Sequence, residues 1–425
     1  MPVPKASFPP NIAAYLAKRA VSAPWRICPP PQRTFAGAVV IPSLAESANL
    51  RLTLESLSHN PADLLDRFMV LVVVNQRVDA GDVERNDNLA TLAMLPEWKK
   101  EYRLEHLCWV DTSSPGQELP ARQGVGLARK IGLDLSLLWL DYRAGDPLLV
   151  CLDADTLVQP DYLPAIVAHF SGSSRGGASI PYRHRQAEDP QGQRAIERYE
   201  LFLRSYVLGL ELAASPYAFH TVGSAMACRA SAYVAAGGMN RRLAGEDFYF
   251  LQQVHKTSGV APLAGTIVHP SPRSSLRVPF GTGRSVGDIL AEGEQRLMFY
   301  RPQVFSILGE WLECVAGSLD SGGSDLLERA GRIAPLLRDF LEQAGFDGSW
   351  DGLLKQNRDQ ARLQAAFHGW FDAFRTMRLI HVLSDQGYAR ISPEEAVPPL
   401  LARACYQCPG DLSGMLRVLR SSQGV

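Results

Sequence analysis

Three almost wholly apolar runs lie between residues 36 and 155 and constrain the fold most strongly. AGAVVIPS (36–43), RFMVLVVVN (67–75) and PLLVCLDAD (147–155) each have the length of a strand. Near-continuous apolar character is typical of parallel strands covered on both faces. Between the runs, Leu50, Leu54 and Leu57 recur at helical spacing, and GVGLARKIGLDLSLLWL (124–140) also indicates a helix. The alternation of strand and helix predicts a layered α/β fold with parallel strands.

Length, charge and cysteine content narrow the class of protein. With 425 residues, the chain predicts two domains or one enlarged domain. A formal net charge of -1 gives no overall attraction to nucleic acid, so we expect no nucleic-acid partner. Seven scattered cysteines indicate a reduced, intracellular protein. The apolar runs are shorter than the ~20 residues of a spanning helix, and no targeting segment is evident. We therefore expect a cytoplasmic location and leave open a peripheral contact with the inner membrane face.

The pattern along the chain changes twice and predicts three parts. Residues 1–35 form a Pro-rich arm that contains a helix. Residues 36–287 carry the alternation of strands and helices, and residues 288–425 indicate a helical region. The third part shows no chemical motif, so the chemistry is expected in residues 36–287.

Two aspartates one residue apart, Asp153 and Asp155, end the third run. In open α/β sheets ligands bind beyond the carboxyl ends of the strands, and this pair falls at such an end. Carboxylates at this spacing can hold one Mg²⁺ or Mn²⁺, whose other positions are filled by water and phosphate oxygens. The alternative is a solvated turn in which Asp155 caps the following segment.

A second acidic pair, Glu246 and Asp247, begins an apparent helix just after a glycine. A carboxylate there can act as a general base that takes the proton of an attacking hydroxyl. The alternative is an ordinary charged first turn, since the helix dipole favours acidic residues at this end.

A third set of polar residues begins where the apolar stretch TIVH ends at His269. The imidazole of His269 could bind the same cation as the aspartates. Arg273, Arg277 and Arg284 suit a diphosphate, because arginine donates paired N–H groups to phosphate oxygens. The alternative for each arginine is a solvated surface side chain.

Together these motifs resemble the family 2 glycosyltransferases of the GT-A fold, over residues 36–285. The matching order is VVIPS, VLVVVN, GVGLARKIGL, CLDAD and GGM…GEDFYF. The resemblance implies a mixed, mostly parallel sheet flanked by helices, here followed by a C-terminal helical region. It also implies metal-dependent transfer of a sugar, with Mn²⁺ or Mg²⁺, from a nucleoside-diphosphate sugar to an acceptor hydroxyl. Inversion at the anomeric carbon is expected if a carboxylate base is present.

The resemblance assigns one set of residues to the donor. Pro42, Ser43 and Glu46 correspond to the nucleotide-base pocket. Asn75 stands where the family has an aspartate that binds the base, and this leaves the base open, because asparagine can donate where aspartate only accepts. Arg129 lies in the matched helix motif and is expected among the donor-binding residues.

The resemblance assigns a second set to the reaction centre. Asp153 and Asp155 correspond to the pair whose metal bridges the donor diphosphate, so Asp153 is expected to contact metal and donor. Asp247 corresponds to the catalytic base, with Glu246 as its helper. His269 is similar to a C-terminal metal-binding histidine of related GT-A enzymes.

Other classes of protein share parts of this pattern. A haloacid-dehalogenase-like phosphatase would use Asp153 as nucleophile and Asp155 as acid and base. That motif usually opens its domain, whereas here a long patterned stretch precedes it. A sugar-nucleotide pyrophosphorylase would need a Gly-rich first loop, and IPSLAESANL (41–50) has no glycine. A catalytically inactive GT-A-like binding protein is the third alternative.

The acceptor stays open among glycans, lipids and small molecules. Arg183, His184 and Arg185 follow an apolar stretch near the expected cleft and could face an anionic acceptor. The alternative is a basic loop that pairs with Glu188 and Asp189.

Overall fold

The computed structural model describes residues 8–21, 24–274 and 281–425, which fall into two compact units. The first unit comprises described residues of Met1–Gln186, Thr221–Arg284 and Gly424–Val425, and the second comprises Ala187–His220 and Ser285–Gln423. The division into residues 1–35, 36–287 and 288–425 stays a prediction. The contacts group residues 187–220, which that division placed in the middle part, with the later helices.

The first unit is built on a mixed sheet of eight strands in the order β1-β4-β3-β2-β5-β8-β7-β9. Strand β8 runs antiparallel to β5 and β7, β1 runs antiparallel to β4, and the other neighbours are parallel. A separate antiparallel pair joins β6 and β10. The strands are β1 (Ile27–Cys28), β2 (Gly37–Ser43), β3 (Phe68–Asn75), β4 (Leu107–Thr112), β5 (Leu148–Cys151), β6 (Leu157–Val158), β7 (Gly177–Ser179), β8 (Met226–Arg229), β9 (Val260–Pro262) and β10 (Val268–His269).

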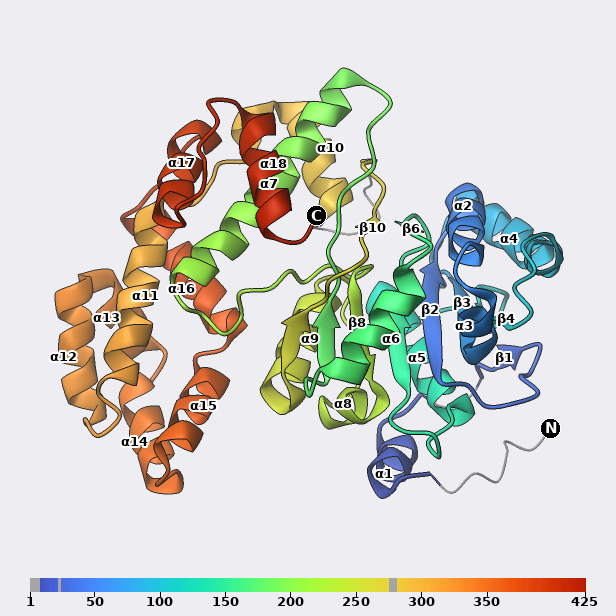
Figure 1. Cartoon of the computed structure of the whole chain (residues 1–425), viewed down its shortest axis with the longest axis horizontal. Helices are drawn as coiled ribbons and strands as arrows, with labels where there is room; N and C mark the ends of the chain where they lie inside the picture. The colour runs from blue at the N-terminus through green and yellow to red at the C-terminus, as the bar shows by residue number, and fades with distance from the viewer. Residues whose placement is uncertain (1–7, 22–23, 275–280) are drawn as a thin grey trace. The chain divides into compact units, whose positions relative to one another are not determined.

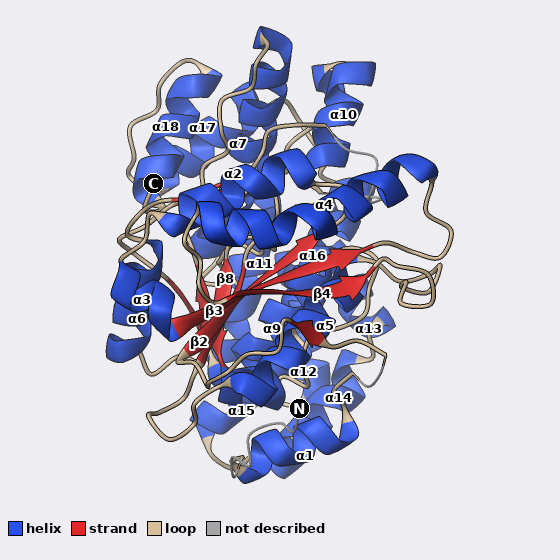
Figure 2. Cartoon of the chain, turned by 90° about the vertical axis from the view of Figure 1, so that its right-hand side faces the viewer, coloured by secondary structure: helices blue, strands red, loops and turns tan. Residues whose placement is uncertain are grey.

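Helices cover both faces of this sheet, with α4 on one face and α5 on the other (Figure 2). The central strands β2 and β3 are buried along their whole length, as their apolar sequences predict. The helices of this unit are α1 (Pro10–Lys18), α2 (Ser47–Ser58), α3 (Ala62–Arg67), α4 (Asp82–Glu101), α5 (Val125–Ser136), α6 (Tyr162–Gly172), α8 (Ala230–Ala235) and α9 (Glu246–Ser258).

Helix α5 lies unusually close to the sheet because Gly132 has no side chain. A Cβ atom at Gly132 would lie 2.3 Å from Cγ1 of Val40 and 2.9 Å from Cγ2 of Val73. Such distances are far inside van der Waals contact, so only glycine allows this packing. The close approach fixes α5, and with it Arg129, against the two central strands.

The second unit consists, in its described residues, of helices joined by loops, with one isolated bridge between Phe299 and Ile391, and its α7 appears beside α18 in Figure 1. Its helices are α7 (Pro190–Leu212), α11 (Pro302–Ala316), α12 (Gly323–Ile333), α13 (Pro335–Gln343), α14 (Phe346–Gln356), α15 (Gln360–Trp370), α16 (Ala373–Gln386), α17 (Pro393–Arg403) and α18 (Leu412–Ser422); α10 (Thr282–Glu292) begins at the boundary. Trp311, Trp350 and Phe367 lie in one apolar core. The predicted fold class, a mixed and mostly parallel sheet flanked by helices with a C-terminal helical region, is confirmed.

A buried polar network in the second unit ties α18 to α7. Glu200 is fully buried and accepts hydrogen bonds from Nε of Arg204 at 2.9 Å and from Nε and Nη2 of Arg420 at 2.7 and 3.0 Å. Gln423 accepts a hydrogen bond from Nη1 of Arg204 at 3.0 Å, and its Oε1 lies 2.9 Å from Nε2 of His220. Buried charges need partners of this kind, and here they connect helices far apart in sequence.

The described parts of the chain contain no helix whose length and apolar character would let it cross a bilayer.

Candidate active site

The two predicted acidic pairs meet on one buried arginine. Arg129 projects from α5, and its Nη2 donates to Oδ1 of Asp153, just beyond the end of β5. Its Nη1 donates to Oε1 of Glu246, the first residue of α9. The side chains of Arg129 and Glu246 are each only 4% exposed. One guanidinium therefore joins the aspartate motif to the residue next to Asp247.

The backbone around Arg129 is shaped to receive it. A Cβ atom at Gly223 would lie between 2.5 and 2.8 Å from three atoms of the Arg129 guanidinium. A Cβ atom at Gly126 would lie 2.5 Å from the carbonyl oxygen of Arg242. Gly223 thus leaves room for the guanidinium, and Gly126 lets the loop before α9 lie close to α5.

Charge and burial act in opposite directions on the groups around Arg129. Burial alone would lower the pKa of Arg129, but the nearby carboxylates of Asp153 and Asp247 outweigh it and raise this pKa. Burial raises the pKa of Asp247, against the opposing charge of Arg129 and a 2.7 Å hydrogen bond from its neighbouring Phe248 N–H. A carboxyl with a raised pKa holds a proton more readily than an exposed aspartate, as a general base requires.

A second arginine contacts two further acidic residues that the sequence analysis named. Nη2 of Arg273 contacts Oε1 of Glu46 and lies 3.2 Å from Oδ2 of Asp155. Glu46 also accepts a hydrogen bond from Nδ2 of Asn49 at 2.9 Å. The structure therefore places Glu46, Asp155 and Arg273 together, although they come from three separate segments.

The end of β3 settles how the amide of Asn75 is oriented. Nδ2 of Asn75 donates to the carbonyl oxygens of Ser43 at 3.0 Å and Val73 at 3.1 Å. Both N–H groups face backbone acceptors, which leaves the side-chain oxygen as the group that can meet a ligand. Asn75 thus offers an acceptor, as an aspartate would, but without the charge. Ser43 and Pro42 are buried in β2, and the hydroxyl of Ser43 has no hydrogen-bond partner among the described residues.

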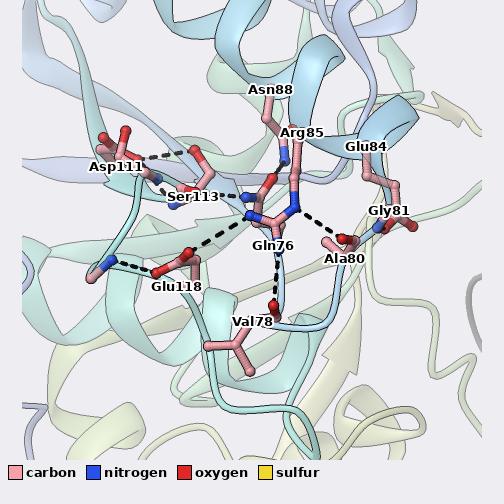
Figure 3. A network of polar contacts seen from close by, with 12 residues as sticks. Gln76, Val78, Ala80, Gly81, Glu84, Arg85, Asn88, Asp111, Ser113 and Glu118 are labelled. Carbon is pink, nitrogen blue, oxygen red and sulfur yellow. Dashed lines mark hydrogen bonds and ion pairs between the residues drawn. The ribbon is translucent and has the colours of Figure 1, made fainter.

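Polar contacts beside Asn75 join the loops that follow β3 and β4 (Figure 3). Gln76 donates to the carbonyl of Ser113 at 2.7 Å and accepts from Nδ2 of Asn88 at 3.1 Å. Arg85 donates to the carbonyl oxygens of Val78 and Ala80, both at 2.9 Å. Side chains of α4 therefore hold the loop that follows Asn75.

Asp111 anchors the other side of the same network. Its Oδ1 accepts hydrogen bonds from the N–H groups of Ser113 and Ser114, both at 2.9 Å. Burial would raise the pKa of Asp111, but hydrogen bonds from Ser114 and Ser113 outweigh it, so the pKa is lowered. The network thus carries an ionised carboxylate close to the pocket expected for a base.

His269 lies at the end of β10, opposite Leu157 of β6. Its Nδ1 is 3.1 Å from the carbonyl oxygen of Arg183, and its Nε2 is 3.4 Å from Nε2 of Gln159. A carbonyl at Nδ1 favours the tautomer in which Nδ1 carries the proton, and Nε2 then holds the lone pair that a metal would need.

The predicted metal ligands do not form a ready cluster. Across residues 8–21, 24–274 and 281–425, no group of three or more His, Cys, Asp and Glu side chains is arranged to hold a metal ion. Asp153 and Asp155 are instead engaged by Arg129 and Arg273. The donor set still fits a hard cation, since Mg²⁺ takes one or two protein carboxylates and completes its shell with water and phosphate oxygens.

The last two predicted arginines are Arg277 and Arg284. Arg277 lies outside the described residues. Arg284 lies in the first turn of α10 and is the last residue of the segment Thr221–Arg284 of the first unit.

Sequence reasoning missed a buried cluster behind Arg129. Asp134 of α5 accepts hydrogen bonds from the hydroxyls of Tyr15 at 2.8 Å and Tyr233 at 2.7 Å, and from the N–H of Val21 at 2.9 Å. Lys130 lies 2.9 Å from the same carboxylate. Lys130 and Asp134 stand four residues apart on the helix, and this i,i+4 spacing was the one available signal.

Comparison with known proteins finds similarity to solved structures only. No protein-family model matches the chain, and no curated protein does. Residues 1–349 of TarS from S. aureus, in complex with UDP-GlcNAc, are 12% identical, with 92% of this chain and 91% of that chain covered and a TM-score of 0.38.

Two further similar structures also contain nucleotide ligands. The mannosyltransferase PcManGT from Pyrobaculum calidifontis, in complex with GDP-Man and Mn²⁺, is 16% identical, covering 85% of this chain and 93% of that chain, with a TM-score of 0.39. Glucosyl-3-phosphoglycerate synthase from Mycobacterium tuberculosis, with Mn²⁺, UDP and glucosyl-3-phosphoglycerate, is 17% identical, covering 61% and 73%, with a TM-score of 0.34. At such identities and scores, function has to be argued from this chain's own residues.

Proposed function

We propose that the protein is a metal-dependent glycosyltransferase of the family 2, GT-A type. It would move a hexose from a nucleoside-diphosphate sugar to an acceptor hydroxyl, with inversion. One observation carries the proposal: a single buried guanidinium, that of Arg129, contacts both Asp153 and Glu246. Two acidic motifs separated by more than ninety residues of sequence thereby share one site beyond the end of β5.

The donor end of the proposed site accounts for the first acidic pair. Glycosyl transfer from a sugar nucleotide releases a nucleoside diphosphate, whose negative charge must be stabilised. Asp155, Asp153 and His269 would hold a Mn²⁺ or Mg²⁺ ion, which when bound neutralises the leaving diphosphate as a Lewis acid. Arg273 and Arg284 would add N–H donors to phosphate oxygens, and Arg277 keeps the same proposed role.

The base pocket would lie over the ends of β2 and β3. Pro42, Ser43 and Glu46 would form one wall, and Asn75 would present its side-chain oxygen to a base N–H group. The proposal for Arg129 changes with the structure: because both of its Nη groups bind carboxylates, we propose that it positions Asp153 and Glu246 and does not contact the donor.

The acceptor end accounts for the second acidic pair. Asp247 would take the proton of the attacking hydroxyl, and its raised pKa matches that task. Glu246 would hold α9 in place through Arg129. Direct attack on the face opposite the leaving group gives inversion.

The phosphatase alternative fits this geometry less well. Asp153 would have to attack phosphorus with a carboxylate oxygen, yet its Oδ1 accepts a hydrogen bond from a buried arginine. That contact lowers the availability of the lone pair that a nucleophile uses.

Donor binding tests the proposal directly. Thermal unfolding would be followed with UDP-GlcNAc and GDP-Man, the donors seen in the similar structures, each with and without Mn²⁺. We expect one donor to raise the melting temperature only when Mn²⁺ is present, because a ligand that binds only the folded state stabilises it. Asp155→Asn should abolish this rise. Asp63→Asn is the matched control, because Asp63 is exposed in the first turn of α3, the helix that ends just before β3 begins.

Two results would contradict the proposal. Release of phosphate from phosphomonoesters, lost in Asp153→Asn, would identify a phosphatase. If the chain with metal present neither binds a nucleotide nor shows activity, the alternative that remains is the catalytically inactive GT-A-like protein.

A further inference from the structure

Residues 181–185 form an extended edge beside β10. The N–H of Arg183 donates to the carbonyl of Val268, and the N–H of Arg185 donates to the carbonyl of Pro270, both at 2.9 Å. Val268 in turn donates to the carbonyl of Pro181 at 2.9 Å. In extended backbone, alternate side chains point to the same side. Arg183 and Arg185 are therefore directed to one side of this edge.

This edge lies next to the proposed metal pair, because β10 pairs with β6, just after Asp155 (Figure 1). Nη2 of Arg185 lies 3.3 Å from the main-chain carbonyl oxygen of Asp155. The Nε of Arg185 is buried and has no hydrogen-bond partner within the described residues. A buried donor without a partner indicates a group that a ligand can satisfy.

Among the described residues, Arg183 and Arg185 differ from the other arginines of the site in having no carboxylate partner. Arg129 and Arg273 each bind two carboxylates. In the part of the chain that the structure describes, no acidic side chain forms an ion pair with Arg183 or Arg185, and Arg183 is exposed. The alternative of a basic loop that pairs with Glu188 and Asp189 involves residues of the second unit and stays a prediction.

Two uncompensated arginines on one side of a strand edge match a ligand with about two negative charges. Arginine binds phosphate through paired N–H groups, and a phosphate monoester carries close to −2 charge near neutral pH. The carboxylate of Asp155 faces Arg273 and Glu46, where we place the donor, whereas Arg185 contacts its main-chain carbonyl. Arg185 thus approaches Asp155 by a contact separate from that of Arg273.

We infer that Arg183 and Arg185 form an anion subsite beside Asp155, and that the acceptor of the transfer carries a phosphate group. The identification of the bound molecule as the acceptor rests on the proposed function, whereas the phosphate subsite itself does not depend on it. Arg183 and Arg185 act as specificity-determining residues that recognise the acceptor before its hydroxyl meets Asp247.

Binding of sn-glycerol 3-phosphate, compared with glycerol, tests the subsite at constant ionic strength. We expect the wild-type chain to bind the phosphate ester and not glycerol. The double variant Arg183→Gln/Arg185→Gln should bind it about tenfold more weakly or worse, as expected when charge-assisted hydrogen bonds are lost. Arg183→Gln alone, at an exposed side chain, should give a smaller loss in the same direction. Arg67→Gln, exposed at the end of α3, is the matched control and should change nothing.

Binding of UDP with Mn²⁺ to the same variants separates the outcomes. We expect UDP affinity to change less than threefold in the double variant. A parallel loss of UDP affinity would assign the arginines to the donor diphosphate and overturn the inference. Equal affinity of wild type and double variant for the phosphate ester, or equal binding of glycerol, would also overturn it. If the wild type binds no nucleotide but shows arginine-dependent phosphate binding, the subsite stands and the proposed transferase function fails.

Discussion

The guanidinium of Arg129 contacts two carboxylates, and its side chain is almost wholly buried. Two negative charges held close together repel, and only the shared cation makes their proximity tolerable. Arg129 and its two carboxylates together therefore add little net stability to the fold. Loss of one of the three groups costs much more, because the others stay buried and uncompensated.

Removal of the Arg129 guanidinium gives the first stability prediction. Arg129→Met should lower the free energy of unfolding by about 3–5 kcal/mol, the usual cost of breaking a buried ion pair from one side. Urea unfolding of the full chain measures it. Arg143→Met, which breaks the exposed pair with Asp141, should leave the midpoint unchanged. Equal midpoints for the two variants would show that Asp153 and Glu246 find other partners.

The sequence analysis named the acidic residues of the candidate site but not the side chains that pair with them. Asp153, Asp155 and Asp247 could be named because their chemistry recurs at fixed places after strands and before helices. The arginine that engages each carboxylate comes from far away in the chain, as Arg273 does for Glu46. Long-range pairing depends on the folded topology, which local spacing does not contain.

At the scale of single elements, α5 is the helix that brings the sheet and the site together. Its sequence predicted a helix, and its Gly132 marks the point of closest approach to β2 and β3. A side chain there would push the helix outward and carry Arg129 with it.

Two glycine substitutions in helices should therefore have opposite effects. Gly132→Ala should destabilise the protein by about 1–3 kcal/mol, because its Cβ overpacks Val40 and Val73. Gly352→Ala in α14 should stabilise it by about 0.5–1 kcal/mol, since nothing lies within 4 Å of the new Cβ and alanine favours a helix. Urea unfolding of both variants checks the signs. Stabilisation by Gly132→Ala would show that α5 is more loosely packed than the distances indicate.

Other elements were beyond the reach of the sequence. Helix α4 was not predicted, because its buried positions include Asn88 and Thr91, so no clear apolar face appears. The antiparallel direction of β8 was not predicted either, because the direction of a short apolar run is set by the connection before it.

At the scale of the whole molecule, the two units differ in what holds them together. The first depends on a sheet, whereas the second depends on an apolar core and on the network around Glu200. Helix α7 belongs to the second unit although it interrupts the first in sequence. The sequence pattern could not show this, because α7 has the same amphipathic character whichever core it covers.

The stability of the second unit should fall at acid pH because of His220. Burial, with the nearby charge of Arg204, lowers the pKa of His220 to about 4, against an ordinary value near 6.5. Below about pH 6.5 the unfolded chain binds a proton that the folded chain does not, so stability falls as the pH drops toward 4. The loss should approach roughly 1 kcal/mol per pH unit. Melting temperatures between pH 7 and 4.5 measure it, and His220→Gln should flatten the curve. An equally steep curve in the variant would place the titrating group elsewhere.

Neighbouring residues Arg129 and Lys130 leave α5 about 100° apart and are fastened to different partners. One holds the carboxylates of the site, and the other lies against Asp134 and Tyr15. A twist of the helix about its own axis would strain both attachments together. Rotation of α5 about its own axis is therefore restrained, and any change of shape at this site has to come from the connecting loops.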